Sequence, residues 1–269
     1  MRPASAQYHD PVSTFVYASD LHGNRAAYDR LFALEADGVV LGGDLLPYPL
    51  RSGGDLLSAQ RRFVAEYLAD KFASRPCWWI PGNDDWETVL PPLEAKGTPI
   101  HNRAAPFLDG LSIAGYGCVP VTPFGMKDFD RYDVEGWEPR DEPERCLWSS
   151  PAGVESVPLG AVRARGTIAA DLERLASLSD PARTVYVVHS PPFATTLDRL
   201  HGGITPIGSR ALRAFIDRRR PPLTLHGHVH ESPGVERLGG TVCVNPGDSM
   251  SRLRAVRVDL KDLTVTPLP

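Results

Sequence analysis

Residues 12–24 carry the sequence VSTFVYASDLHGN, in which an apolar run is followed directly by an acid, a histidine and a glycine. The run predicts a buried strand, and Ala27, Leu31 and Leu34 then recur with the spacing of one helix face. The same order recurs along the chain, with strands predicted at VVLGG (39–43), PCWWI (76–80) and TVYVV (184–188). It predicts a mostly parallel sheet whose loops gather at the carboxyl ends of the strands.

Helical spacing follows each of these runs. The helix after residues 39–43 includes Val64, Tyr67, Leu68 and Phe72 on one face. A short helix after residues 76–80 ends near Lys96, and another, after 184–188, spans about 208–219 with Gly208 or Ser209 at its start. The C-terminal third instead holds short β-type segments that predict hairpins in a second, mixed sheet: PLTLH, VERL, TVCVN, RAVRVDL and LTVTPL. Gly239 and Gly240 suit a hairpin turn, because glycine accepts positive φ.

Residues 119–165 are expected to form an irregular insertion in a single domain that spans residues 1–269. Six prolines lie there among scattered charges and aromatic residues. A loop of this length is usually functional or disordered, and the aromatic residues argue against full disorder. The segment is expected to form a lid or substrate wall, or else a surface loop that packs on its own aromatic side chains.

Composition excludes some partners. The chain has 269 residues, of which 42% are hydrophobic and 23% charged, and its net charge of −4 provides no strong field for nucleic acid or a membrane surface. The N-terminal segment lacks the apolar stretch of a signal peptide, and no window resembles a membrane span. The four cysteines are far apart without a CxxC pair, as in reduced proteins. A cytoplasmic protein with a small-molecule partner is expected.

Metal-capable side chains follow the predicted strands. Five of the eight histidines occur in these positions. Singly, each acid or amide is typical of a helix cap or turn and each histidine of a buried core residue. Together, at one edge of a sheet, they predict a site for two divalent ions that hold a hydroxide and a phosphoryl group. Gly23, Gly43, Gly82 and Gly227 would let the backbone turn tightly there. The side chains are Asp20, His22, Asp44, Asn83, His189, His228 and His230, and the fifth histidine of these positions is His226.

The motifs DLHGN, GGD, GNDD, VVHSPP and GHVH, in this order, resemble the five signature motifs of the calcineurin-like metallophosphoesterase superfamily. They cover residues from about 12 to 247. The segments LDRLHGGITPIGSRALRAFI, TPF (122–124) and VNPG (244–247) are similar to the Icc-related branch of predicted phosphoesterases. The resemblance implies an α/β fold, a four-layer α/β/β/α sandwich of two stacked mixed sheets with a dinuclear site at one edge.

By this resemblance, Asp20, His22 and His230 bind the first metal, Asp44 bridges, and Asn83, His189 and His228 bind the second. The candidate catalytic residues are His22, Asp44, Asn83 and Asp84. The ligand types suit Mn²⁺, Fe²⁺, Co²⁺, Ni²⁺ or Zn²⁺. His226 matches no ligand position, and we expect it to be a buried residue behind Gly227.

Asp84 stands where many relatives carry a histidine. An ionised Asp84 would repel a phosphate dianion, which disfavours a phosphomonoester and favours a phosphodiester or phosphoanhydride, such as a nucleotide-like substrate. Alternatively, burial and Asp85 raise the pKa of Asp84 until it can donate a proton. Asp85 is also a candidate to orient a metal-binding histidine.

Three other residues are candidates for binding substrate. Asn24 and Arg25 begin a helix, where they could meet a phosphate, although Asn24 suits an ordinary N-cap equally well. His201 lies in a glycine-rich loop and could replace the missing acid, or it is an exposed loop histidine.

Two other functions remain as alternatives. A noncatalytic scaffold that binds a partner would be expected to have lost ligands, whereas all seven positions hold suitable side chains. A protein Ser/Thr phosphatase is disfavoured, because GGDLLPYPL lacks the Asp-Arg-Gly usual in that group.

Overall fold

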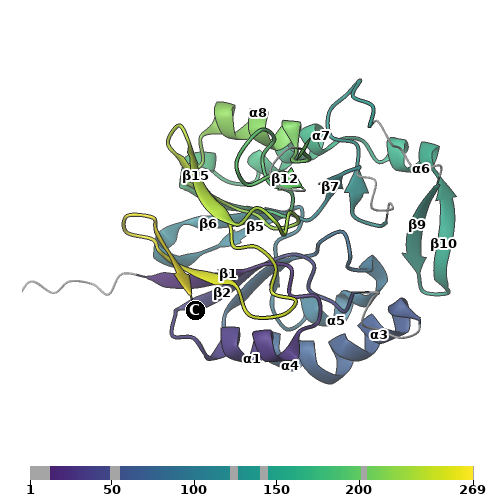
Figure 1. The fold of residues 1–269 in the computed structure, drawn as a ribbon, viewed down its shortest axis with the longest axis horizontal. Coiled ribbons are helices and arrows are strands. Elements are labelled where there is room, and N and C mark those ends of the chain that lie inside the picture. The colour runs from purple at the N-terminus through teal and green to yellow at the C-terminus, as the bar shows by residue number, and fades with distance from the viewer. Residues whose placement is uncertain (1–12, 49–54, 122–126, 140–144, 201–204, 269) are drawn as a thin grey trace, which may run out of the picture.

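The computed structural model describes residues 13–48, 55–121, 127–139, 145–200 and 205–268. Two six-stranded mixed sheets stack face to face, with helices on both outer faces (Figure 1). The first sheet has the order β18-β17-β1-β2-β3-β4 and the second β15-β16-β14-β11-β6-β5. This arrangement confirms the four-layer sandwich implied by the motifs.

The first sheet contains four parallel strands and a C-terminal hairpin. The parallel strands are β1 (Thr14–Ala18), β2 (Gly38–Gly42), β3 (Cys77–Ile80) and β4 (Thr98–Pro99). The hairpin consists of β17 (Ala255–Asp259) and β18 (Thr264–Leu268), and β17 pairs antiparallel with β1. The expectation that all C-terminal segments join a second sheet is therefore wrong for this hairpin.

The second sheet also has four parallel strands, flanked by an antiparallel strand at each edge. The parallel strands are β6 (Ser112–Tyr116), β11 (Thr184–Val188), β14 (Leu223–Leu225) and β16 (Thr241–Asn245). The edges are β5 (Arg103–Pro106) and β15 (Gly234–Leu238). The β11 strand, expected beside the N-terminal strands, belongs here. In the β15–β16 turn, Gly239 alone of the two glycines has positive φ, +59°.

Alternating side chains along the strands form two cores, one between the sheets and one between the sheets and the helices. Phe15, Tyr17 and Val40 of the first sheet pack between the sheets with residues of the second, such as Val185 and Val187. The intervening side chains face the helices instead, because successive strand residues point to opposite faces. Val16, Leu41 and Trp79 lie in that outer core, as does Tyr186, whose ring meets Phe215 edge-on at 5.0 Å.

The first sheet is covered by α1 (Arg25–Ala33) and by a long helix, α3 (Leu56–Phe63), η1 (Val64–Leu68) and α4 (Ala69–Ala73), with a π turn in its middle. Figure 1 shows these helices below the sandwich and α7 (Ile168–Ala176) and α8 (Arg210–Arg219) above it. Ser209 caps α8, as the sequence predicts. The predicted short helix is α5 (Pro91–Glu94). Short 3₁₀ turns occupy Glu87–Val89, Leu108–Gly110 and Pro181–Arg183.

The segment expected to be irregular contains regular structure. After the short strands β7 (Val119–Pro120) and β8 (Asp130–Arg131), an antiparallel hairpin of β9 (Arg145–Ser150) and β10 (Gly153–Pro158) leads into α6 (Leu159–Ala164). Residues 145–164 therefore differ from the expected irregular loop. The hairpin contacts the main body where the Ser149 hydroxyl accepts the Thr88 amide. A two-stranded ribbon, β12 (Arg199–Leu200) with β13 (Thr205–Pro206), lies near α8.

No helix among the described residues is long and apolar enough to cross a membrane.

Candidate metal centre

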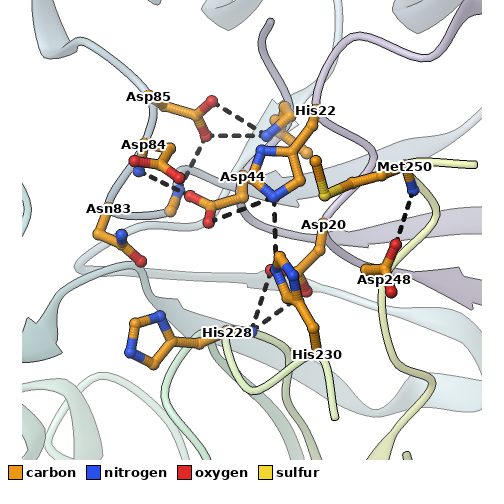
Figure 2. A network of polar contacts seen from close by, with 12 residues as sticks. Asp20, His22, Asp44, Asn83, Asp84, Asp85, His228, His230, Asp248 and Met250 are labelled. Atoms are coloured by element: carbon orange, nitrogen blue, oxygen red, sulfur yellow. Dashed lines mark hydrogen bonds and ion pairs between the residues drawn. The ribbon is translucent and has the colours of Figure 1, made fainter. Parts of the chain in front are cut away.

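The candidate site lies where strands of both sheets end. Asp20 and His22 follow β1, Asp44 follows β2 and Asn83 follows β3. From the second sheet, His189 follows β11, and His228 and His230 follow β14. Since parallel strands direct their carboxyl ends to one edge, the stacked sheets bring these loops together (Figure 2). Asp20 and His230, which the resemblance assigns to the same ion, lie next to each other.

One group of ligands gathers around Asp20. His230 Nε2 lies 3.2 Å from Asp20 Oδ1 and 3.4 Å from His22 Nε2, and potential ligand atoms of Asp20, His22, Asp44 and His230 all lie within 4.8 Å of one another. Two imidazole nitrogens that face each other next to carboxylates need either a shared proton or a cation. The buried Nδ1 of His22 has no hydrogen-bond partner among the described residues. This donor set fits a divalent ion.

A second group gathers on the other side of Asp44. His189 Nε2 lies 3.3 Å from Asp44 Oδ2 and 3.2 Å from Asn83 Oδ1. The ring of His228 lies 5.4 Å from that of His189, and its buried Nε2 is likewise without a hydrogen-bond partner in the described part of the chain. Because Asp44 Oδ2 is also 3.9 Å from His22 Nε2, this carboxylate lies between the two groups.

The backbone at the site adopts conformations that are rare for residues with a side chain. Asp20, His22, Asp44 and His228 all have positive φ, between 43° and 65°. Hydrogen bonds between the loops hold this geometry: the amide of Asp20 donates to Gly43 O at 3.0 Å, and that of His22 to Asp44 O at 2.9 Å. Such strain persists where the surrounding structure imposes it, and it is concentrated at functional sites.

Two glycines are required by close approach. A Cβ on Gly82 would lie 2.2 Å from Asp44 Oδ1 and 2.7 Å from His189 Nε2. A Cβ on Gly227 would lie 2.3 Å from Asp20 Oδ2 and 1.9 Å from the hydroxyl of Ser19. A side chain at either position would therefore collide with candidate ligands.

The two acids stay ionised and are paired with histidines. Burial alone would raise the pKa of Asp44, but the charges of His189 and His22 and a hydrogen bond from the Asp84 amide lower it well below its usual range. Burial likewise opposes ionisation of Asp20, and its contact with His230 lowers the pKa. Burial and the positive charge of His189 lower the pKa of His228 to about 3, so its ring is neutral and suited to bind a metal.

Asp85 orients backbone rather than a histidine. Its buried carboxylate accepts the amides of Leu45, Leu46 and Gly82 at distances from 2.8 to 3.1 Å. In Figure 2 it points away from Asn83, toward the loop after β2. The idea that Asp85 orients a metal-binding histidine is therefore wrong, and its role is to join the two loops that carry Asp44 and Asn83.

The other candidates lie outside the ligand groups. Asn24 is an N-cap that accepts the Ala27 amide, and its own amide donates to Ser249 O and Met250 O, so a phosphate contact is not supported. Arg25 is exposed and lies over the Tyr67 ring, 4.9 Å from its centroid. His226 is buried, with ring nitrogens bonded to Val188 O and the Thr224 hydroxyl, as expected for a core residue. His201 lies outside the described residues.

Sequence reasoning missed Lys127. Its ammonium forms a hydrogen-bonded ion pair with the Asp84 carboxylate. Lys127 is separated from Asp84 by 43 positions and follows no strand, so no motif signalled it. Burial and Asp44 raise the pKa of Asp84, while Lys127 opposes this rise, so the expectation that Asp85 raises it is wrong. Asp84 faces a substrate as part of an ion pair and not as an isolated negative charge.

The protein is thus an α/β/β/α sandwich with a candidate metal centre at the carboxyl ends of its parallel strands. A family model for calcineurin-like phosphoesterases matches residues 13–232, so the chain belongs to that family. The family and the cluster of Asp and His ligands are consistent with a metal-dependent phosphoesterase, a hydrolase that acts on phosphoester bonds.

Comparison with known proteins gives distant relatives. The uncharacterized protein MJ1162 of Methanocaldococcus jannaschii is 22% identical over 232 residues, 85% of each chain. In structure, a dimetal phosphatase from Danio rerio superposes with a TM-score of 0.54 at 14% identity, covering 93% of both chains. Phosphopantetheinyl hydrolase from Mycobacterium tuberculosis superposes with a TM-score of 0.57 at 16% identity, covering 88% of this chain and 90% of that one. The two structural likenesses show a shared fold.

Proposed function

We propose that this protein hydrolyses a phosphodiester or phosphoanhydride bond of a small, nucleotide-like substrate with the help of two divalent ions. The observation that carries the proposal is the position of Asp44, whose Oδ2 faces His22 at 3.9 Å on one side and His189 at 3.3 Å on the other. A carboxylate between two ligand groups is the arrangement that two adjacent cations require. When bound, the ions would supply Lewis acidity and an activated water.

The protein groups have distinct roles in this proposal. Asp20, His22 and His230 would hold one ion, Asn83, His189 and His228 the other, and Asp44 would contact both. Asn83 contributes a neutral amide oxygen, which leaves the pair of ions more strongly Lewis acidic than a further carboxylate would. The strained loops after β1, β2 and β14 fix these groups before substrate arrives, so little reorganisation is needed.

The proposed substrate follows from charge. Asp84 and Lys127 neutralise each other, so this pair adds no net positive charge to balance a phosphate dianion. A diester or an internal anhydride phosphate carries a single negative charge at the reacting phosphorus and depends less on such a charge. The net charge of −4 also favours a small-molecule partner over nucleic acid, and we propose a cytoplasmic location.

The test uses purified protein saturated with Mn²⁺. We expect hydrolysis of bis-p-nitrophenyl phosphate to exceed that of p-nitrophenyl phosphate, with activity on at least one of a panel of cyclic and dinucleotide substrates. Metal analysis after gel filtration measures the number of ions and, in protein purified without added metal, identifies them among Mn, Fe, Zn, Co and Ni. No hydrolysis of any substrate would refute the proposal, and less than one tightly bound ion per chain would favour the noncatalytic scaffold instead.

A further inference from the structure

Lys127 is a nearly buried cation beside the candidate metal centre. Its side chain is 15% exposed and that of its partner Asp84 is 11% exposed. Among the residues that the structure describes, the ammonium has this one hydrogen-bond partner, although an ammonium carries three donors. The remaining donors are therefore available to a further acceptor.

The chain holds Lys127 in place through its backbone. The Lys127 amide donates to Asp130 Oδ2 at 2.8 Å, and the Asp130 amide donates back to Lys127 O at 3.1 Å. The neighbouring Asp128 accepts the Glu87 amide at 2.9 Å and both the amide and the hydroxyl of Ser149. The turn that carries Lys127 is thus fastened to the loop that carries Asn83 and Asp84 and to the β9–β10 hairpin.

Asp84 is equally well fixed, and it connects Lys127 to the metal ligands. Its amide donates to Asp44 Oδ1 at 2.7 Å, and its carbonyl oxygen accepts the Gln60 side chain at 2.7 Å. Figure 2 shows the carboxylates of Asp84 and Asp44 next to each other. Asp84 therefore links the Lys127 ammonium to Asp44, whose carboxylate lies between the two ligand groups.

We propose that Lys127 is a substrate-positioning residue, tethered by Asp84, whose ammonium binds a phosphate oxygen of the substrate at the metal centre. This inference rests on the proposed function for the location of the phosphate. Burial alone would lower the pKa of Lys127, but Asp84 and Asp44 raise it, so the side chain remains a cation. A single tethered ammonium binds one oxygen and orients the substrate.

Lys127 can affect anion binding in two ways, by neutralising Asp84 or by contacting the anion directly. A single substitution does not distinguish these two effects. Lys127→Met removes the cation, but it also exposes the substrate to an unpaired Asp84. The variant D84N/K127M removes both charges and has the net charge of the wild-type pair. If Lys127 only neutralises Asp84, the double variant binds anions like the wild type; if Lys127 contacts the anion, affinity is lost.

The experiment measures binding of inorganic phosphate to Mn²⁺-loaded protein by calorimetry, which does not depend on turnover, in mildly acidic buffer that keeps the phosphate mostly monoanionic like the proposed substrate. We expect D84N/K127M to bind phosphate about tenfold or more weakly, the loss of one charge-assisted hydrogen bond. Lys127→Arg is expected to retain most of the affinity, because it keeps a cationic donor. Lys261→Met is the matched control, since Lys261 is exposed in the turn between β17 and β18. Equal metal content and thermal unfolding of each variant establish that the centre is intact.

Phosphate affinity of D84N/K127M within twofold of the wild type would refute the role of Lys127, as would wild-type protein that binds no phosphate at millimolar concentration. The two proposals fail separately. Wild-type protein that binds phosphate through Lys127 but hydrolyses no substrate would refute the proposed function alone. Active wild-type protein whose affinity is unchanged in the double variant would refute the role of Lys127 alone.

Discussion

Gly82→Ala tests whether the loop after β3 must approach the ligands as closely as the structure shows. The new Cβ would lie 2.2 Å from Asp44 Oδ1, 2.3 Å from the Asp44 amide nitrogen and 2.7 Å from His189 Nε2. Ordinary contacts require at least about 1 Å more. Because one of these atoms belongs to the backbone, rotation of a side chain cannot relieve the clash.

The expected loss follows from this displacement. Overpacking of a close-packed interior costs about 1 to 3 kcal/mol of stability. A misplacement of about 1 Å in a catalytic centre lowers activity by roughly 100-fold. We therefore expect Gly82→Ala to remain folded with a lower melting temperature, to retain less metal after gel filtration, and to hydrolyse bis-p-nitrophenyl phosphate roughly 100-fold more slowly.

Gly160→Ala provides the matched control. It makes the same change in α6, where a Cβ would have no atom within 4 Å, and alanine favours a helix over glycine. Stability is expected to be unchanged or slightly increased, with full activity. Melting by circular dichroism, metal content and kcat are compared for both variants. Wild-type metal content and a kcat within twofold of the wild type for Gly82→Ala would show that the packing argument is wrong.

Two further predictions concern Asp44 and Asp130. Asp44→Asn should lower kcat by at least about 1,000-fold and reduce metal content, because a neutral amide cannot offset the repulsion of two adjacent cations; turnover within tenfold of the wild type at equal metal content would contradict the assignment. Burial raises the pKa of Asp130 to about 8 from a usual value of 3.8, so the folded state binds more protons than the unfolded state between these values and stability falls as pH rises toward 8. Asp130→Asn cannot ionise but can still accept the Lys127 amide, so its melting temperature should exceed that of the wild type at pH 8 by about 2 °C or more, with a smaller difference at pH 5. The same difference at both pH values in thermal unfolding would argue against a raised pKa.

Local signals were sufficient for most of the strands and for placing the candidate ligands near strand ends. The run at 184–188 is strand β11 without any shift, and Ser209 caps α8 as its position before the helix indicates. Each candidate ligand directly follows a buried strand or lies within a few residues of its end, so the end of an apolar run marks where these polar side chains occur. The change from an apolar run to polar residues depends only on residues that are close together in the sequence.

The allocation of strands to sheets required long-range contacts. Strand β17 pairs with β1 across most of the chain, as in the register Phe15 with Val258. A hairpin that joins the first sheet has the same alternation as one that joins the second, since both bury one face. The β9–β10 hairpin was missed for a different reason: its scattered prolines and charges concealed a short ribbon that is stabilised by contacts with the loop at Thr88.

By itself, the sequence determined which side chains can bind metal and that each lies at the end of a strand, because strand alternation and turn chemistry are local properties. Only the tertiary structure decided what surrounds the adjacent acids Asp84 and Asp85. Asp85 accepts three amides from two loops, whereas Asp84 is paired with Lys127 from a turn 43 positions away. Residues so far apart in the sequence are brought into contact by the packing of two sheets and an inserted hairpin. The spacing of residues along the chain does not predict such contacts.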